Sequence, residues 1–426
     1  MNRLLYTVVA ALCVSPTTYV NAETLDKQQA FIKALHNNPS YRAALADIRS
    51  AEGQRAQASL LVNPNAVFEI ENFAGEDEQE GFDGAELTFG IEQTIEIGGK
   101  RKNRTSIADY DVKISHEQAK AQALSLLAET EYAFIRLAVA EEGLKLADRR
   151  LGLADKTHDI VKNRIGAAKA PEIQHTKADI EKASAEVEKR QAQKELLSAK
   201  NNLARILGGS EDAEGISVDV SLDKLPQLMD RQVMIDALQQ SPQARMQQFM
   251  NMRAKSSLSL AHSYSLPDPT FGIGVRRFNE NDSTALIASI SIPIPVFNRN
   301  QGEIVKAQAD VVKAEAIGQA SYLTQEQSAI DAWESLSSAI EETKRYQSEI
   351  IPSARKAYNQ ADEGYSRGAF SFLDLLDAQR TLNEVQEAHL KSILNLYQAK
   401  VQAEFLMGTH ETLVQNINSS NEGETK

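Results

Sequence analysis

Two segments of the chain alternate between apolar and polar side chains with the period of two that is typical of β-strands. Across residues 85–97, Leu87, Phe89 and Ile91 fall on one face, while glutamates, threonines and a glycine fall on the other. Residues 66–73 alternate in the same way, and an acidic, Gly-rich loop separates the two segments. The pattern therefore predicts an antiparallel hairpin with strands at about 66–73 and 85–97.

Long stretches elsewhere are dominated by Ala, Glu, Lys, Gln and Leu, and aromatic residues make up only 6% of the chain. This composition is typical of long packed helices. Residues 105–163 contain no strong helix breaker, so they predict one helix that approaches ~90 Å at ~1.5 Å per residue. A counterpart over 302–364 should be kinked at Pro352. Residues 375–406 place Leu, Val and Ala at alternating steps of three and four, which predicts coiled-coil packing.

The order of these elements occurs twice along the chain. Each copy is predicted to contain a helix (25–59 or 231–262), a Pro-containing stop, a hairpin, a long helix, a Gly-containing turn and a second helix. The second hairpin is predicted at about 270–278 and 284–295. We interpret the chain as a tandem duplication, a mostly helical α+β protein with four strands. Landmarks that recur 203 positions later include Ile32 as Ile235, Leu35 as Leu238, Pro39 as Pro242, Pro64 as Pro267 and Phe68 as Phe271.

Residues 1–22 read as a secretory signal peptide, because Arg3 precedes an uncharged apolar run and small residues near Ala22 offer a cleavage site. Cys13 lies inside that run behind Leu12, where a lipoprotein needs a small residue, so we expect Cys13 to be removed rather than acylated. We divide the remainder into a first repeat (23–210), an equatorial linker (211–228), a second repeat (229–410) and a C-terminal tail (411–426) of disordered composition.

The charge and the histidine pattern exclude several classes of protein. Removal of residues 1–22 takes away Arg3 and no acid, which leaves 45 basic against 59 acidic residues and a net charge of −14. Such an acidic chain without basic runs is not expected to bind nucleic acid. The seven histidines are scattered without recognisable metal-ligand spacing, and phosphate-binding loops and nucleophile elbows are absent from the sequence. We therefore expect neither an enzyme nor a bound cofactor or metal.

The amphipathic hairpins are the segments that suit a membrane. No apolar run of ~18 residues follows the signal, so membrane insertion would have to use the strands. A soluble sandwich edge is the alternative for a single hairpin, but no other strands are predicted that would build a second sheet. Four strands cannot close a barrel, whereas two copies give eight strands and three copies give twelve with an aqueous bore. The polar strand faces predict an acidic lumen lined by Glu69, Glu71, Glu86, Glu92 and Glu96.

The duplicated order of elements resembles the TolC-like outer-membrane factor family over nearly the whole mature chain. Residues 95–101, which include Gly98-Gly99-Lys100-Arg101, and residues 293–302 resemble the strand-to-helix junctions of its heavy-metal branch, the CzcC- and CusC-like proteins. The resemblance implies a homotrimer with a twelve-stranded β-barrel in the outer membrane and a helical tunnel in the periplasm. It also implies two partners, a periplasmic adaptor (membrane fusion protein) and an inner-membrane resistance-nodulation-division (RND) pump.

The same resemblance assigns roles to residues at the far ends of the long helices. Asp374 and Asp377 are similar to the aspartates that ring the closed aperture, and Tyr365 is similar to a tyrosine that latches the helices shut. Phe370 stands where multidrug members carry an arginine, so the latch partner does not transfer; Arg367 and Arg164 remain candidates. The turns between helices imply adaptor contacts at Gly166, Ala167, Arg367, Gly368 and Ala369.

The predicted function is an outer-membrane duct for heavy-metal cations such as cobalt, zinc, cadmium, nickel, copper or silver. Organic drugs or proteins secreted by a type I system remain alternative cargoes, because a wide aqueous tunnel selects little. A periplasmic coiled-coil scaffold or adaptor is the alternative of another class. It explains the helices but leaves the two amphipathic hairpins without a purpose.

Overall fold

The structure is a computed structural model that describes residues 24–74, 81–168, 170–209, 213–414 and 416. The signal peptide predicted for residues 1–22 lies outside these ranges, as does most of the predicted tail. The chain divides into two compact units. The described residues within 24–30 and 133–222 form one, here the helix-pair unit, and those within 31–132 and 223–416 form the other, here the sheet unit.

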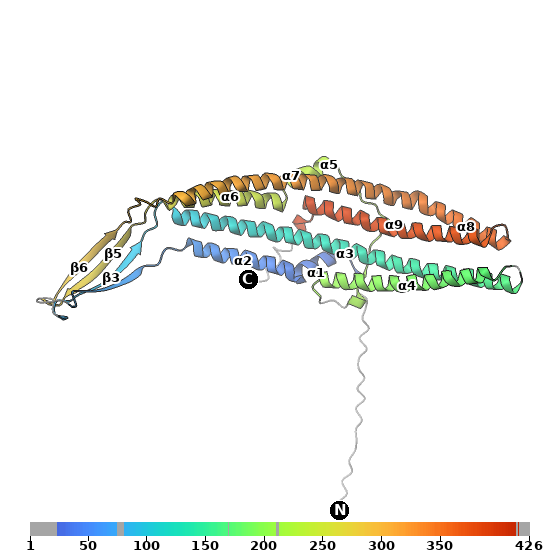
Figure 1. Ribbon diagram of the computed structural model, residues 1–426, viewed down its shortest axis with the longest axis horizontal. Helices are drawn as coiled ribbons and strands as arrows, with labels where there is room; N and C mark the ends of the chain where they lie inside the picture. Colours follow the sequence, from blue (N-terminus) through green and yellow to red (C-terminus); the bar gives the residue numbers. More distant parts are fainter. Residues whose placement is uncertain (1–23, 75–80, 169, 210–212, 415, 417–426) are drawn as a thin grey trace, which may run out of the picture. The chain divides into compact units, whose positions relative to one another are not determined.

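The sheet unit contains one antiparallel sheet built from both repeats. Its strands are β2 (Asn65–Glu71), β3 (Glu86–Thr94), β5 (Thr270–Phe278) and β6 (Ser283–Ser291), in the order β2-β3-β5-β6 (Figure 1). The two hairpins join through the pairing of β3 with β5, in which Phe89 lies opposite Val275. β3 and β6 end earlier than the predicted limits of 97 and 295. The Ile97 amide donates to Asp268 Oδ1 (2.8 Å) instead of to a strand, and the prolines after β6 lack an N–H.

Each helix predicted before a hairpin is two helices, so the predictions of single helices over 25–59 and 231–262 were wrong. The first is split into α1 (Lys27–Asn37) and α2 (Pro39–Ser59), and the second into α5 (Arg231–Leu238) and α6 (Pro242–Ser263). The side chains of Asn38 and Ser241 cap the second helix of each pair. A proline follows each cap, where its missing N–H leaves no helical hydrogen bond unmade. The sequence motif Asn-Pro or Ser-Pro thus starts a new helix.

The second long helix is interrupted where a kink was expected. α7 (Gln301–Arg345) passes through a π-helical turn, η3 (Tyr346–Ile350), into α8 (Ile351–Arg367). The wide turn lies directly before Pro352, and such turns relieve the loss of a proline's backbone hydrogen bond. α8 then reverses into α9 (Phe372–Met407), which lies beside α7 in Figure 1.

The core of the sheet unit includes a seam between α5, α7 and α9. Met234, Leu238, Leu336 and Leu396 are each at most 3% exposed in this cluster. The predicted seam of α9 also buries the polar residue Ser392, whose carbonyl accepts a hydrogen bond from Thr343 Oγ1 at 3.3 Å. The apolar spacing read from the sequence therefore corresponds to real helix packing, with Ser392 fitted into it.

The helix-pair unit is an antiparallel pair of helices joined by a short turn (Figure 1). Residues 133–166 of α3 (Lys100–Gly166) lie beside α4 (Ile173–Ile206). Ion pairs tie the two helices together along their length. In the predicted linker, η2 (Ala213–Gly215) is followed by the short strand β4 (Ser217–Val218), which pairs in parallel with β1 (Thr24–Leu25). The cross-helix ion pairs include Lys189 with Asp148, Arg150 with Glu188, and Lys182 with Asp155.

The first residues of the predicted tail pack against the sheet unit. Residues 411–414 are helical, and Val414 is only 1% exposed. Arg245 holds this segment, since its guanidinium lies 2.5 Å from the Glu411 carboxylate and 2.8 Å from that of Glu117. Among the described residues, the helices are either too polar or too short to cross a membrane.

Candidate functional site

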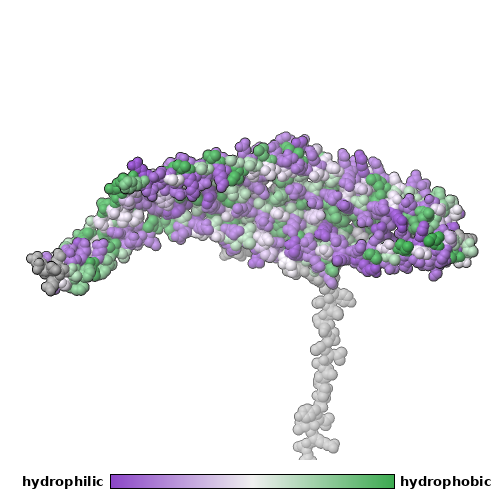
Figure 2. Space-filling view, in the orientation of Figure 1, coloured by the Kyte–Doolittle hydropathy of each residue, from purple (hydrophilic) through white to green (hydrophobic). Residues whose placement is uncertain are grey.

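One face of the sheet is apolar, and its side chains are largely exposed among the described residues. Phe68, Phe89, Val275 and Leu286 lie opposite one another across the four strands. Their exposed fractions are 64%, 60%, 44% and 89%. Figure 2 shows hydrophobic side chains gathered over the strands. An apolar surface of this kind marks a site that contacts lipid or another protein.

The opposite face carries the predicted lumen acids, but an arginine side chain that the sequence analysis did not consider lies among them. Arg276 of β5 contacts Glu71 at 2.6 Å and Glu86 at 2.7 Å, and its Nε donates to Thr88 Oγ1 at 2.9 Å. Glu69 lies on the same face, opposite Thr88. Arg276 was visible as a polar position of the second hairpin, but only the pairing of β3 with β5 reveals its carboxylate partners.

Glu96, which follows the end of β3 at Thr94, pairs with a second arginine. Arg104 Nη1 donates to Glu96 Oε1 at 2.6 Å, and the same guanidinium donates to the carbonyls of Ala58 and Leu60. The hydrogen bond with Glu96 raises the pKa of Arg104, so this guanidinium stays charged. Glu92, in contrast, lies directly beside Gly272. Three of the five predicted lumen acids, Glu71, Glu86 and Glu96, are thus paired with arginines, and the acidic lumen stays a prediction.

The Gly-Gly-Lys junction after the first hairpin connects this segment to the segment before the second hairpin. Gly98 and Gly99 both have positive φ angles (70° and 78°), a conformation that favours glycine. They place Lys100 so that its Nζ donates to the Leu266 carbonyl at 2.7 Å and contacts Asp268 Oδ1 at 2.6 Å. The Lys100 side chain is only 4% exposed. The motif thus joins the junctions of the two repeats.

The turn between α8 and α9 presents exposed residues and a rigid interior. Gly368 has a φ of 78°, and the Ala369 amide donates to the Gly364 carbonyl at 2.8 Å. The Phe370 ring packs so closely on Gly364 that an added Cβ would lie 2.2 Å from it. Arg367, one of the proposed latch partners, forms an ion pair with Glu363.

The turn between α3 and α4 reverses differently from the prediction. The sequence analysis predicted a Gly-containing turn here, but Gly166 ends α3 and the positive φ (56°) falls on Ala168. The Ala168 amide donates to the Ile165 carbonyl at 2.8 Å. Gly166, Ala167 and Ala168 are all exposed. The tip is therefore accessible, but its conformation is imposed on an alanine.

The two predicted aperture aspartates differ in their surroundings. Asp374 Oδ2 accepts hydrogen bonds from the Ser371 amide (2.8 Å) and hydroxyl (2.7 Å), which completes a capping box at the start of α9. The Ser371 hydroxyl and then its amide lower the pKa of Asp374, so this carboxylate is charged at neutral pH. Asp377 is exposed one turn later, beside the buried Leu375 and Leu376.

Tyr365 lies in the interior of the α8–α9 hairpin. Its side chain is 2% exposed, and its ring packs against Phe372 with centroids 5.6 Å apart. A residue so placed holds α8 against α9, which is compatible with a latch within this hairpin.

Two groups of possible metal ligands lie among the described residues. In the first, Glu131, Glu404 and His410 approach one another, but Lys400 Nζ donates to both carboxylates at 2.8 Å. The carboxylate of Glu131, followed by that of Glu404, raises the pKa of His410 to about 9. Protonated His410 and Lys400 thus neutralise two carboxylates. This group is a partly buried ion-pair network in which the Lys400 ammonium occupies the place that a metal cation would take.

The second group consists of His158, His175 and Asp179 in the helix-pair unit. The sequence analysis held that no histidine and carboxylate stood at ligand spacing, and this was wrong. His175 and Asp179 are four positions apart on α4, so they share a helix face. That spacing is visible in the sequence, whereas the approach of His158 from α3 required the fold.

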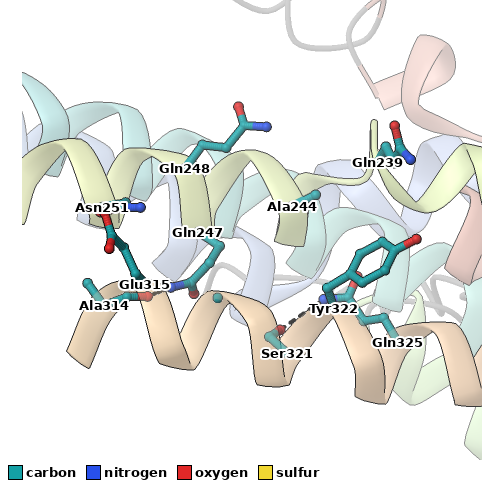
Figure 3. A pocket seen from close by; sticks show the side chains of 11 residues that line it. Gln239, Ala244, Gln247, Gln248, Asn251, Ala314, Glu315, Ser321, Tyr322 and Gln325 are labelled. Atoms are coloured by element: carbon teal, nitrogen blue, oxygen red, sulfur yellow. Dashed lines mark hydrogen bonds between the residues drawn. The ribbon is translucent and has the colours of Figure 1, made fainter. Parts of the chain in front are cut away.

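An open pocket of about 640 Å³ lies between α6 and α7 (Figure 3). Its lining is rich in amide side chains, and Gln247 Nε2 donates to the Ala314 carbonyl at 3.1 Å. Gly318 permits this close approach, because a Cβ there would lie 3.0 Å from Gln247 Cγ. The residues around the pocket include no histidine or cysteine, and most of their polar groups are amides that donate and accept hydrogen bonds.

Comparison with known proteins identifies the family. The profile of the family described as outer membrane efflux protein matches residues 31–209 and again residues 233–409. This chain belongs to the outer membrane efflux protein family. The two matches correspond to the two repeats. The predictions of an efflux channel, of location in the outer membrane and of the TolC-like fold are thereby confirmed.

Relatives and solved structures agree with this assignment. The chain is 27% identical to the cobalt-zinc-cadmium resistance protein CzcC of Cupriavidus metallidurans, over 91% of each sequence. It is 23% identical to the nickel-cobalt-cadmium resistance protein NccC of Alcaligenes xylosoxydans, over 72% of this chain and 69% of the relative. Its fold is similar to that of a membrane protein from Pseudomonas aeruginosa, with a TM-score of 0.79, 19% identity and coverage of 95% and 96%. The family consists of efflux proteins, not of enzymes.

Proposed function

We propose that this outer membrane efflux protein is the duct through which a tripartite system of the RND type exports heavy-metal cations. The observation that supports metal cations as the cargo is the similarity to a cobalt-zinc-cadmium resistance protein over 91% of both chains. The strand-to-helix junctions at residues 95–101 and 293–302 support the same branch of the family. The proposal assigns no catalytic step to this chain; an inner-membrane pump supplies the work.

The proposed assembly is a homotrimer. Within the chain, β2 and β6 are the edges of the sheet, and unpaired edges in a membrane leave backbone groups without hydrogen bonds. Pairing these edges between copies closes the sheet. Three copies give twelve strands and an aqueous interior, whereas two give an interior filled by side chains. The exposed row from Phe68 to Leu286 then faces lipid, and Arg276 with its glutamates faces water.

The proposed aperture lies at Asp374 and Asp377 near the turn of α8 and α9. Three copies bring six carboxylates around one constriction, which attracts cations and repels anions. The lowered pKa of Asp374 supports a charged ring at neutral pH. Tyr365 is the proposed latch residue, acting through its packing between α8 and α9.

The proposed adaptor contacts are the exposed turns at the ends of the helices. They comprise Gly166 and Ala167 in one turn and Arg367, Gly368 and Ala369 in the other. Small residues at these positions leave the backbone accessible, and Arg367 supplies a charged group at the edge. A periplasmic membrane fusion protein is the proposed partner.

Tolerance assays in a Gram-negative host that lacks this protein test the cargo. Restoring the gene should raise the tolerated concentration of Co²⁺, Zn²⁺, Cd²⁺ or Ni²⁺ by several fold, and leave the tolerance of organic drugs unchanged. If the gene restores only the tolerance of drugs, or the secretion of a protein, the cargo is not a metal cation, but the protein is still an efflux duct.

Planar-bilayer conductance of the purified protein tests the duct itself. The variant Asp377→Asn should weaken block by a divalent cation, because it removes charge without touching the capping box. Asp374→Asn should weaken block as well, and Ser371→Ala serves as the control that disturbs the cap alone. A protein that assembles properly but conducts no ions would favour the scaffold alternative.

A further inference from the structure

The turn end of the helix-pair unit brings histidines of two helices onto one carboxylate. His158 Nε2 lies 3.1 Å from Asp179 Oδ1, and His175 Nδ1 lies 2.9 Å from Asp179 Oδ2. The two imidazole centroids are 5.1 Å apart. We propose that these three side chains bind one divalent transition-metal cation per chain, of the class that includes Zn²⁺, Co²⁺ and Ni²⁺.

The ligand set selects this class of cation. Two neutral imidazoles and one carboxylate suit zinc, cobalt and nickel, whereas Mg²⁺ and Ca²⁺ prefer shells made only of oxygen. None of the three residues is a thiol or thioether, which are the ligands that favour Cu⁺. Three protein ligands leave at least one coordination position for water.

The distances between the donor atoms fit a metal with little rearrangement. Donor atoms around a tetrahedral zinc at ~2.0–2.1 Å are about 3.3 Å from one another. The two histidine nitrogens already lie 3.1 Å and 2.9 Å from the Asp179 oxygens, and all three ligand atoms lie within 4.8 Å of one another. Small side-chain rotations are therefore sufficient, without movement of either helix.

A second carboxylate orients the ligand on α3. His158 Nδ1 lies 3.4 Å from Asp159 Oδ1, on the side of the ring opposite to Asp179. A histidine that donates one N–H to a carboxylate presents its other nitrogen, as a lone pair, to a metal. Asp159 therefore favours the tautomer of His158 in which Nε2 is free to coordinate.

The surroundings leave the site accessible and its negative charge available. The side chains of His158, His175 and Asp179 are 18%, 30% and 51% exposed, so a cation reaches them from solvent. The nearby Lys182 is directed to another carboxylate, that of Asp155, at 2.8 Å. This arrangement contrasts with the Glu131 group, in which Lys400 already neutralises the acids.

The position of the site gives a bound cation a mechanical effect. His175 lies in the first turn of α4, and His158 lies eight residues before the end of α3 at Gly166. A cation shared by the two helices would clamp them beside the exposed turn at Gly166 and Ala167. Metal binding would thus stiffen this tip.

Titration of the full chain, purified in detergent and stripped of metal with a chelator, tests the proposal. Calorimetry with Zn²⁺ at neutral pH should give a site of about one ion per chain. The visible absorption of added Co²⁺ should show nitrogen coordination. His158→Gln and His175→Gln should each weaken Zn²⁺ affinity at least tenfold, and Asp159→Asn by about tenfold.

Two histidine variants serve as matched controls. His116→Gln changes an exposed histidine of the same helix, and His410→Gln changes the only histidine of the Glu131 group. Both should bind Zn²⁺ like the parent protein. Circular dichroism and the oligomeric state of each variant show whether it has folded and assembled.

Failure of the folded parent protein to bind Zn²⁺ would overturn the proposal. So would undiminished affinity in His158→Gln and His175→Gln, or loss of the site in His410→Gln alone. These measurements use isolated protein and do not depend on the proposed cargo. If cells that carry the protein tolerate metal but the purified protein binds no Zn²⁺ at this site, the metal site is wrong and the proposed efflux function stands. If the purified protein binds Zn²⁺ at this site but confers no metal tolerance, the metal site stands and the proposed cargo is wrong.

Discussion

Lys100 Nζ lies 2.6 Å from Asp268 Oδ1, which joins the junction after the first hairpin to the junction before the second. The two residues belong to different repeats of the duplicated chain. The Lys100 side chain is 4% exposed, and Asp268 also accepts a hydrogen bond from the Ile97 amide. The pair is therefore part of a hydrogen-bonded connection that is largely shielded from solvent. These contacts connect the two junctions between hairpins and helices.

Replacing Lys100 by methionine should therefore destabilise the protein. The change leaves Asp268 without its cation in a poorly solvated place, and breaking one side of a buried pair costs about 3 kcal/mol of the free energy of unfolding. Thermal unfolding of the detergent-purified protein measures the effect. Lys102→Met, at an exposed position of the same helix, should change stability by less than about 0.5 kcal/mol. Equal effects of the two changes would contradict the structural role of Lys100.

Gly364→Ala should disrupt the α8–α9 turn. The new Cβ would lie 2.2 Å from the Phe370 ring, so either the ring or the helix must move, and overpacking of this kind costs about 1–3 kcal/mol. The double variant Gly364→Ala with Phe370→Ala should recover much of that loss. Gly152→Ala, where the added Cβ meets no atom within 4 Å, should be neutral or slightly stabilising. Melting temperatures of the three variants decide the matter.

Ala168→Gly should stabilise the other turn. Ala168 has a φ of 56°, and a non-glycine residue in the left-handed region is strained by about 1 kcal/mol. Part of that gain is offset because glycine is freer in the unfolded chain, so the expected net increase is about 0.5 kcal/mol. Ala167→Gly, at a neighbouring position without positive φ, should instead lower stability. Chemical denaturation of both variants gives the sign, and a loss of stability in Ala168→Gly would rule out the strain.

His410 should make the stability of the protein fall at alkaline pH. Its pKa is raised from the ordinary 6.5 to about 9 by Glu131 and then Glu404. The proton is therefore bound more tightly in the folded state. Its contribution is fully present below pH 6.5 and is lost as the pH rises through about 9.

The size of this contribution is about 2 kcal/mol after allowance for solvent screening of a side chain that is partly exposed. Unfolding should be followed from about pH 6 to pH 10 in the parent protein and in His410→Gln. The difference between them should shrink across that range, and the exposed His116→Gln should follow the parent. A constant difference at all pH values would exclude His410 as the titrating group.

The sequence by itself determined the repeated plan of helices and strands. Alternation with a period of two in residues 85–97 identifies a strand wherever it packs, because successive side chains point to opposite faces. The steps of three and four along α9 likewise identify a buried helix seam, confirmed at Leu375, Leu382 and Leu396. Local signals failed where a proline restarts rather than ends a helix, as at Pro39 and Pro242.

Only the tertiary structure decided which distant side chains meet. The register of β3 on β5 brings Arg276 to Glu71 and Glu86, and the antiparallel pairing of α3 with α4 brings His158 to Asp179. Neither relationship follows from spacing along the chain, since ion pairs and metal ligands depend on distances of a few ångströms in space. The sequence supplied the charges and the imidazoles, and the packing of one element on another gave each its partner.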